Sequence, residues 1–215
     1  MSNYWTVYDT HQSEIIVKKS RFIATIKPVF SKEEAEEWIA NCKKTYYDAA
    51  HNCSAYIVGE EQRITHSSDD REPSNTAGKP MLEVLLGKNL TNVCVVVTRY
   101  FGGTLLGTGG LVRAYQQAVI EVLGQSLLIE KRDGYRARLS LDYTDLGKVQ
   151  YYLSNQDIVT YGQEFDTSVY LTVLIPVEQY TVIEKGIVEL SAARVKIEQQ
   201  EIVKYALVNK KIELF

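Results

Sequence analysis

A wholly apolar, β-branched run that leads into a glycine cluster constrains the fold of this chain most. VCVVV (93–97) is typical of a strand buried on both faces of a sheet, because it offers no polar face to solvent. RYFGGTLLGTGGLVRAY (99–115) then contains five glycines, which indicate a backbone path that other residues could not adopt. A helix is predicted to follow, with an apolar stripe at Leu111, Tyr115, Ala118, Val119 and Val122.

A long polar loop, SSDDREPSNTAGK (67–79), is predicted to lie beside the glycine cluster. NCSAYIVG (52–59) and QRITHS (62–67) have the composition of paired strands, and a helix is predicted to begin near Pro80. If the strands before and after that helix form a βαβ unit, they are parallel, and the loops that follow them emerge at the same end of the sheet. The polar loop and the glycine loop are therefore expected to face each other.

Strands and one helix are predicted before these segments. EIIVKK (14–19) and RFIATIKPV (21–29) have strand composition. Ser31 and Glu34 then form a capping-box pattern that opens an amphipathic helix.

The glycine loop lacks the spacing of both common nucleotide-binding motifs. No third glycine stands where the dinucleotide fingerprint requires it, and no Lys-Ser or Lys-Thr follows Gly107. Thr108 is a candidate helix cap, and the two glycines after it leave the first amide groups uncovered, which favours an anion. The candidate anion- or partner-binding residues are Lys79, Arg99, Gly102, Gly103, Thr108, Gly109, Gly110 and Arg113. The alternative is that the glycines only allow a tight turn packed under Tyr100 and Phe101.

Three carboxylates of the polar loop, Asp69, Asp70 and Glu72, are candidate catalytic residues, together with His51. Clustered carboxylates can hold Mg²⁺ or perform acid–base chemistry. Asp69 and Asp70 are therefore candidate metal ligands, and Mg²⁺ is the candidate cofactor. The alternative is that all three carboxylates are simply solvated, as charged loop residues usually are.

A second source of chemistry is a thiol–imidazole pair. His51 and Cys53 would share one face of a strand, which is the placement such a pair needs. The pair alone supplies too few ligands for zinc. The favoured interpretation is that His51 supports the acidic loop through a hydrogen bond, whereas Cys42 and Cys94 belong to the core.

The second half of the chain has the element order of a small βαββαβ domain. Its predicted elements are a strand over 135–143, a helix over 144–155 capped by Thr144, strands over 158–165 and 168–175, a helix whose first turn contains Pro176, and a strand over 194–208. This order is the ferredoxin-like split motif. We expect an α+β chain of two domains, residues 1–132 and 133–215, with the boundary at Lys131-Arg132-Asp133-Gly134.

One face of this second domain has the side chains of an RNA platform. Arg136 and Arg138 are predicted opposite the core face, near Tyr170 and Thr172. The net charge of the chain is −3, however, and nucleic-acid binders usually carry a basic surface. Any nucleic-acid binding would therefore rest on a local patch.

Composition predicts a soluble protein of the cytoplasm. Hydrophobic residues make up 45% of the chain, and the apolar runs are far shorter than the roughly 20 residues that span a bilayer. The first residues lack the pattern of a signal peptide. The three cysteines have no motif spacing, which favours reduced thiols. No membrane partner is expected.

Three long motifs resemble the YigZ/IMPACT family: DAAHNCSAYIVG (48–59), SSDDREPSNTAGKPMLEVL (67–85) and RYFGGTLLGTGGLVRAY (99–115). The resemblance covers essentially the whole chain. It implies an N-terminal fold like the second domain of ribosomal protein S5 and a C-terminal domain similar to parts of elongation factor G. Eukaryotic relatives modulate translation by competing for the activator of a starvation-responsive initiation-factor kinase, whereas the bacterial members have no established activity.

Arg71 and Asn75 stand where the polar loop of that family usually has glycine. If those glycines have a positive φ, asparagine is tolerated there but arginine is strained. Arg71 also places a cation beside the acidic pair.

The leading hypothesis is a non-enzymatic cytoplasmic regulator linked to translation, which docks a ribosome, an RNA, a translation-factor protein or an anionic ligand at the loop end of its first domain. The first alternative is a Mg²⁺-assisted phosphate-handling enzyme, a hydrolase or phosphotransferase. The second alternative is a small-molecule sensor.

Overall fold

Strand β6 (Val93–Tyr100) occupies the middle of a five-stranded sheet, as its apolar sequence predicts. The computed structural model describes residues 3–60, 63–209 and 211–215. The chain divides into two compact units, residues 1–130 and 131–215. No helix in the described part of the chain is long and apolar enough to cross a membrane.

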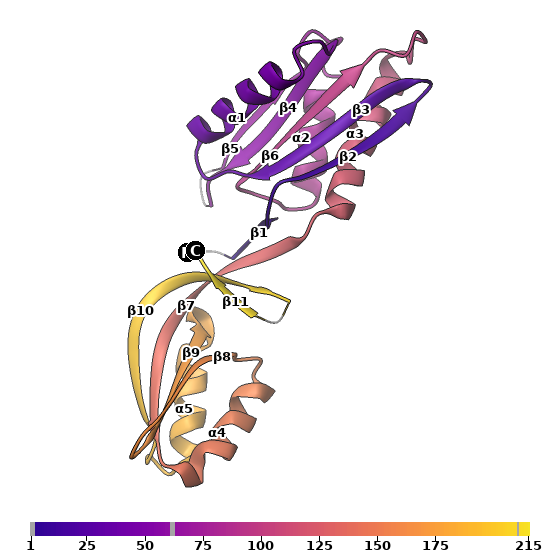
Figure 1. Ribbon diagram of the computed structural model, residues 1–215. Coiled ribbons are helices and arrows are strands. Elements are labelled where there is room, and N and C mark those ends of the chain that lie inside the picture. Colours follow the sequence, from indigo (N-terminus) through magenta and orange to yellow (C-terminus); the bar gives the residue numbers. More distant parts are fainter. Residues whose placement is uncertain (1–2, 61–62, 210) are drawn as a thin grey trace. The chain divides into compact units, whose positions relative to one another are not determined.

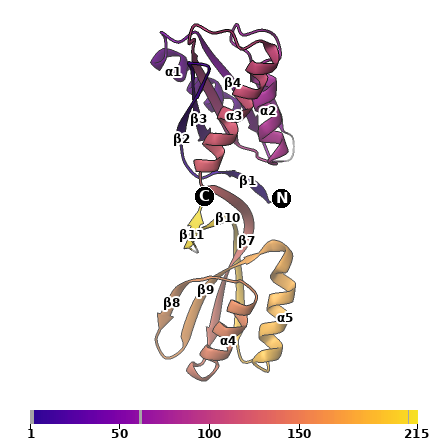
Figure 2. The same cartoon turned by 90° about the vertical axis from the view of Figure 1, so that its right-hand side faces the viewer.

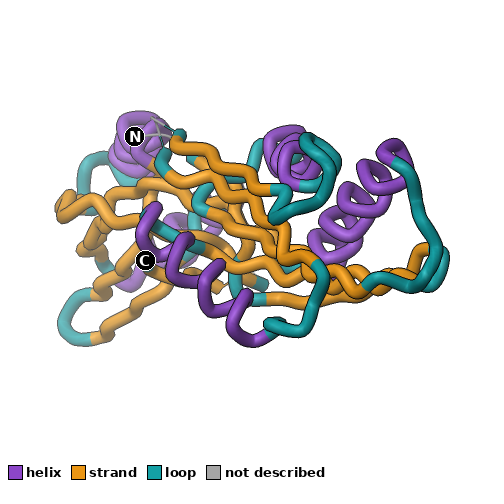
Figure 3. Tube along the Cα trace, turned by 90° about the horizontal axis from the view of Figure 1, so that it is seen from above, coloured by secondary structure: helices purple, strands orange, loops and turns teal. Residues whose placement is uncertain are grey.

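The first unit consists of one sheet with helices on both of its faces (Figures 1 and 3). Its elements are β1 (Tyr4–Val7), β2 (His11–Val17), β3 (Ser20–Pro28), α1 (Lys32–Thr45), β4 (His51–Val58), β5 (Ile64–Ser68), α2 (Gly78–Gly87), β6 and α3 (Thr108–Gln125). The sheet order is β2-β3-β6-β4-β5, and each neighbouring pair is antiparallel. Gln62, the first residue of the strand predicted over 62–67, lies outside the described residues.

The two faces of this sheet bury different helices. Phe22, Val95 and Tyr115 belong to the large core between the sheet and helices α2 and α3. Tyr56 and Cys94 point to the opposite face, where Trp38 of α1 packs against them. Helix α1 begins as its capping pattern predicts, because Ser31 Oγ accepts from the Glu34 amide at 3.0 Å.

The predicted βαβ relation between β5 and β6 needs one correction. Both strands pair antiparallel with β4, so they run in the same direction, but β4 lies between them and they are not neighbours. Helix α2 therefore crosses over β4. The consequence for the loops is unchanged: the segments after β5 and after β6 leave the sheet at the same end.

The second unit has the split βαβ order predicted from its sequence. Its elements are β7 (Leu128–Leu141), α4 (Tyr143–Asn155), β8 (Thr160–Phe165), β9 (Val169–Pro176), a 3₁₀ turn (Val177–Gln179), α5 (Tyr180–Leu190), β10 (Lys196–Val208) and β11 (Lys211–Leu214). The antiparallel order β10-β7-β9-β8 places α4 and α5 side by side on one face (Figure 2), over a core that includes Leu139, Val149, Leu171 and Ile187.

The predicted domain boundary, residues 131–134, lies within β7, where Asp133 is 3.0 Å from Lys204 and Gly134 faces the Tyr205 ring. Two element boundaries in this half differ from the sequence prediction. Asp142 rather than Thr144 is the N-cap of α4. Pro176 ends β9, and a 3₁₀ turn separates it from α5.

Candidate functional site

The polar loop and the glycine loop meet at the end of the first unit's sheet. Arg99, near the end of β6, donates from Nη1 to Glu72 Oε1 of the polar loop at 2.6 Å. Both side chains are buried, with 7% and 3% of their surface exposed. The expectation that the two loops face each other is therefore confirmed, and the contact is a buried ion pair.

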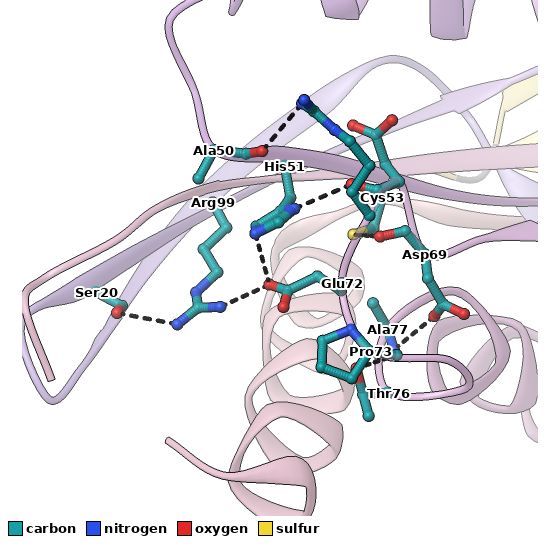
Figure 4. A network of polar contacts seen from close by, with 12 residues as sticks. Ser20, Ala50, His51, Cys53, Asp69, Glu72, Pro73, Thr76, Ala77 and Arg99 are labelled. Atoms are coloured by element: carbon teal, nitrogen blue, oxygen red, sulfur yellow. Dashed lines mark hydrogen bonds and ion pairs between the residues drawn. The ribbon is translucent and has the colours of Figure 1, made fainter. Parts of the chain in front are cut away.

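Glu72 is the centre of a wider network (Figure 4). Its Oε1 also accepts from the Tyr115 hydroxyl of α3 at 2.8 Å and lies 3.7 Å from His51 Nε2. Arg99 Nη2 lies 3.5 Å from Ser20 Oγ, and the guanidinium stacks against the Phe22 and Phe101 rings. Arg99, Tyr115 and His51 all meet one oxygen of Glu72, Oε1, so the protein's own groups hold the carboxylate in place.

Asp69 caps a helix. Its Oδ1 accepts from the amides of Ala77 and Gly78 at 2.9 Å each, and its Oδ2 accepts from the Asn75 amide at 2.8 Å. These amides include the first of α2, which lack acceptors within the helix. The carboxylate therefore folds the polar loop back onto the helix that follows it.

Asp70 ties the polar loop to α1 and β4. Its Oδ1 accepts from Lys43 Nζ at 2.8 Å, and its Oδ2 accepts from the Asn52 amide at 2.7 Å. Burial alone would raise the pKa of Asp70, but the hydrogen bonds from Lys43 and Asn52 outweigh it and hold the pKa below the usual value. His51 Nδ1 lies 3.0 Å from the Asp70 carbonyl oxygen, which is the supporting role predicted for His51.

These contacts argue against the catalytic and metal assignments of the carboxylates. Asp69, Asp70 and Glu72 point to different partners, a helix end, a lysine and an arginine. No group of three or more His, Cys, Asp and Glu side chains able to hold a metal occurs within 3–60, 63–209 and 211–215. The three carboxylates are close together in the sequence, which suggested one cluster, but each has a separate structural role.

Cys53 cannot act as a nucleophile in this arrangement. The side chain is fully buried, with Sγ 3.1 Å from the Asp69 carbonyl oxygen and 3.3 Å from Tyr115 Oη. Burial raises the pKa of the thiol far above its usual range, so the reactive thiolate is not formed near neutral pH. The nearest polar contacts of His51 are to Asp70 and Glu72, and the thiol–imidazole pair is not assembled.

The polar loop is strained at the position that sequence analysis singled out. Asp70, Arg71 and Asn75 have φ values of 40°, 71° and 60°. Asparagine adopts this left-handed region readily, whereas a long side chain does so at a cost. Arg71 stays there with Nη2 3.3 Å from the Ala50 carbonyl oxygen.

The glycine loop uses its glycines in two different ways. At Gly102 a Cβ atom would lie 2.0 Å from the Lys19 carbonyl carbon, so only glycine lets the loop cross the β2–β3 turn. Gly103 and Gly107 have φ values of 81° and 70°, and space is open around both. Gly107, not Thr108 as predicted, is the N-cap of α3, and no side chain caps the helix.

A groove of about 590 Å³ lies between the two loops. Its lining combines charged and apolar side chains: Ala50, His51, Arg71, Glu72, Pro73, Arg99, Phe101, Leu105, Leu106, Gly107, Thr108 and Leu111. Phe101 and Leu105 are 52% and 83% exposed. This volume is within the range of small-molecule sites.

Six of the eight predicted anion-site residues do not line the groove: Lys79, Gly102, Gly103, Gly109, Gly110 and Arg113. Lys79 is exposed on α2 and does not line the groove. Arg113 lines a separate hollow with Val17, Lys18 and Gly110. Of the remaining anion-site candidates, Arg99 and Thr108 line the groove directly.

Sequence reasoning missed the apolar side chains of the groove and the hydroxyl that holds Glu72. Leu105 and Leu106 lie within the glycine motif, and two adjacent leucines between glycines were the available signal of an exposed apolar wall. Tyr115 was assigned to the apolar stripe of α3, where it does lie, but its hydroxyl also holds Glu72.

The arginines of the second unit's open face have partners. Arg136 Nη1 lies 2.7 Å from Glu201 Oε1, and Arg138 Nη2 lies 2.8 Å from Glu164 Oε2. Arg138 also stacks over the Tyr170 ring at 4.4 Å. These carboxylates neutralise the local charge that an RNA backbone would require.

Comparison with known proteins places this chain in the IMPACT family. The Impact N-terminal domain matches residues 18–123, and the domain of unknown function DUF1949 matches residues 139–194. The IMPACT family member YvyE of Bacillus subtilis (strain 168) is 42% identical over 79% of this chain and 84% of its own length. YigZ of Escherichia coli (strain K12) is 35% identical over 74% of this chain and 79% of its own. Protein IMPACT of Mus musculus is 34% identical over 45% of this chain and 31% of its own.

Solved structures support the two-domain α+β architecture. The crystal structure of a hypothetical protein is 30% identical and superposes with a TM-score of 0.60 over 94% of this chain and 98% of its own. The likeness extends through both units of the chain.

Proposed function

We propose that this protein is a non-enzymatic regulator linked to translation, whose first unit docks a partner at the groove between the polar and glycine loops. One observation about the groove carries the proposal. Its reactive side chains are bonded to other groups of the protein, whereas Phe101 and Leu105 are exposed at its wall. An exposed apolar wall beside charged groups is typical of an interaction surface.

Family membership supports the link to translation, because eukaryotic IMPACT proteins regulate translation. On this proposal the partner of the groove is the ribosome, an RNA or a translation-factor protein, and the protein acts in the cytoplasm. The proposal also includes the finer fold assignments: a first domain, residues 1–132, like domain 2 of ribosomal protein S5, and a second, residues 133–215, similar to parts of elongation factor G.

A Mg²⁺-assisted phosphate-handling enzyme has less support. Each carboxylate it would need is bound by the protein's own amides or cations. Metal binding would have to displace these contacts, including a buried arginine.

Co-sedimentation with ribosomes at low and moderate salt tests the leading proposal. We expect the protein in the ribosomal fraction at low salt, and a loss of association in the double variant Phe101→Ser/Leu105→Ser. The matched control is Ile16→Ser, because Ile16, at 68%, has an exposed fraction between those of Phe101 and Leu105 but lies outside the groove. Absence of the protein from ribosomal fractions at both salts, together with no retention of purified translation factors, would contradict the proposal.

The groove also gives specific support to a small-molecule sensor. Its volume suits a compact ligand, and its lining contains both charged and apolar side chains.

A further inference from the structure

The charges that line the groove do not cancel. Glu72 and Arg99 form a buried pair, which leaves the guanidinium of Arg71 in excess. Within the described residues, Arg71 Nη2 donates to a neutral backbone oxygen, that of Ala50, at 3.3 Å. The Arg71 charge also interacts with the Asp70 carboxylate, but Asp70 accepts its hydrogen bonds from Lys43 and Asn52 and does not line the groove. Arg71 is therefore the cation of the groove lining that an anion could pair with.

The N-terminus of helix α3 is a second positively charged feature of the groove. Gly107 and Thr108 line the groove at the start of this 18-residue helix, and no acidic residue lies in its first turn. Its first intrahelical bond runs from the Leu111 amide to the Gly107 carbonyl oxygen, so the amides of 108–110 have no acceptor within the helix. Such amides, together with the helix dipole, favour an anion.

A buried arginine supplies an independent observation. Arg99 lines the groove and is buried, yet its Nε has no hydrogen-bond partner within the described residues. Leaving a buried N–H group of a charged side chain unpaired is costly. Arg99, which lines the groove, therefore keeps an unsatisfied buried donor beside its ion pair with Glu72.

The strain at Arg71 points in the same direction. A backbone φ of 71° at a long side chain costs free energy, and such strain tends to persist where it serves a site. Here Arg71 lines the groove together with Gly107 and Thr108 at the start of α3.

The apolar side chains of the lining indicate the chemistry of the uncharged part of a ligand. The side chains that would bury a hydrocarbon or aromatic group are Pro73, Phe101, Leu105, Leu106 and Leu111. A fully hydrated ion such as free phosphate would leave these side chains unused.

We propose that the groove binds a small amphipathic anion, with its carboxylate or phosphate group on Arg71 and the α3 amides and its apolar group on Phe101, Leu105 and Leu106. This inference uses the same groove as the proposed function but requires no translation partner, so either can fail without the other.

Calorimetric titration of the full chain with four probes tests it: 3-phenylpropionate, its neutral amide 3-phenylpropanamide, phenyl phosphate and inorganic phosphate. We expect saturable binding of 3-phenylpropionate or phenyl phosphate, and at least about tenfold weaker binding of the amide and of inorganic phosphate. The stronger of the two phenyl anions identifies the headgroup. Chemical-shift changes at Gly107, Thr108 and Gly109 would locate the site.

Three variants connect binding to the groove. Arg71→Gln should weaken the better anion about tenfold, because it removes the charge and keeps the length. Arg71→Lys should weaken it less, and Arg63→Gln, an exposed arginine just before β5 and outside the groove, should leave it unchanged. Native tryptophan fluorescence of each variant verifies folding. The proposal is overturned if neither phenyl anion binds at concentrations up to about 10 mM, if the amide binds as well as the acid, or if Arg71→Gln binds like the wild type.

Discussion

Arg99 Nη1 lies 2.6 Å from Glu72 Oε1, and this buried contact fastens the end of the central strand to the polar loop. The pair connects the two walls of the groove, because Glu72 belongs to the polar loop and Arg99 lies just before the glycines of the glycine loop. Removing one partner leaves the other charge buried and uncompensated, which is far more costly than losing a surface pair.

Glu72→Gln should therefore lower the free energy of unfolding of the first unit by about 3 kcal/mol. Urea unfolding followed by tryptophan fluorescence measures this unit alone, since both tryptophans, Trp5 and Trp38, lie within it. The control is Glu14→Gln, which breaks the exposed pair between Glu14 and Arg21 and should leave the midpoint almost unchanged. Equal midpoints for both variants would show that the buried pair does not stabilise the fold.

Asp70 gives the stability of the first unit a dependence on acid pH. The folded-state pKa of Asp70 is depressed below its unfolded value near 3.9, so the ionised carboxylate stabilises the fold above that value. This contribution is lost as the pH falls through the folded-state pKa. The stability difference between wild type and Asp70→Asn should be largest near neutral pH and shrink below about pH 4. A difference that stays constant from pH 7 to pH 3 would contradict the assignment.

Replacing the strained arginine should stabilise the protein. Arg71→Gly relieves a left-handed backbone and should raise the free energy of unfolding by about 1 kcal/mol. Asn75→Gly is the matched substitution, and it should have a smaller effect because asparagine tolerates the same region. The same urea titration compares them. A destabilised Arg71→Gly would mean that the contacts of the arginine outweigh its strain.

The two kinds of glycine in the glycine loop should respond differently to alanine. Gly102→Ala places a methyl group against the Lys19 backbone and should cost about 2 kcal/mol or more. Gly109→Ala meets only the Arg113 guanidinium at 3.7 Å, in a helix, and should raise stability by up to about 1 kcal/mol. Thermal unfolding of both variants decides the matter, and similar melting temperatures would refute the close approach at Gly102.

The cysteines should be inert in the folded protein. Burial raises the pKa of Cys53 and Cys94 far above their usual range and that of Cys42 to about 11. A thiol reagent at pH 8 should label native protein very slowly and all three residues rapidly in urea. Fast modification of Cys53 in the native state would reopen the thiol–imidazole hypothesis.

Sequence patterns predicted the elements well where one physical signal dominated. The apolar run of β6 required a central strand, and the alternation in β7 identified the buried Ala137, Leu139 and Leu141. Chain polarity then placed both loops at one end of the sheet. These predictions depend on local periodicity, which the sequence displays directly.

The roles of individual polar residues were not predictable in this way. Asp69 and Asp70 are adjacent in sequence, yet one caps α2 and the other accepts from Lys43 of α1. Which amide or lysine a loop carboxylate meets depends on how the loop folds back, and residue spacing contains no record of it. Thr108 illustrates the same limit. It was the predicted cap of α3, but the observed cap is Gly107, one residue earlier, which has a positive φ.

The most direct test of the account is photo-crosslinking from the groove in an extract of the source cells. A photoreactive residue at Leu105, 83% exposed at the groove wall, should crosslink to a ribosomal protein, ribosomal RNA or a translation factor. The same residue at Ile16, outside the groove, should not. Crosslinks from Leu105 only to proteins unconnected with translation, or equal crosslinks from both positions, would contradict the account.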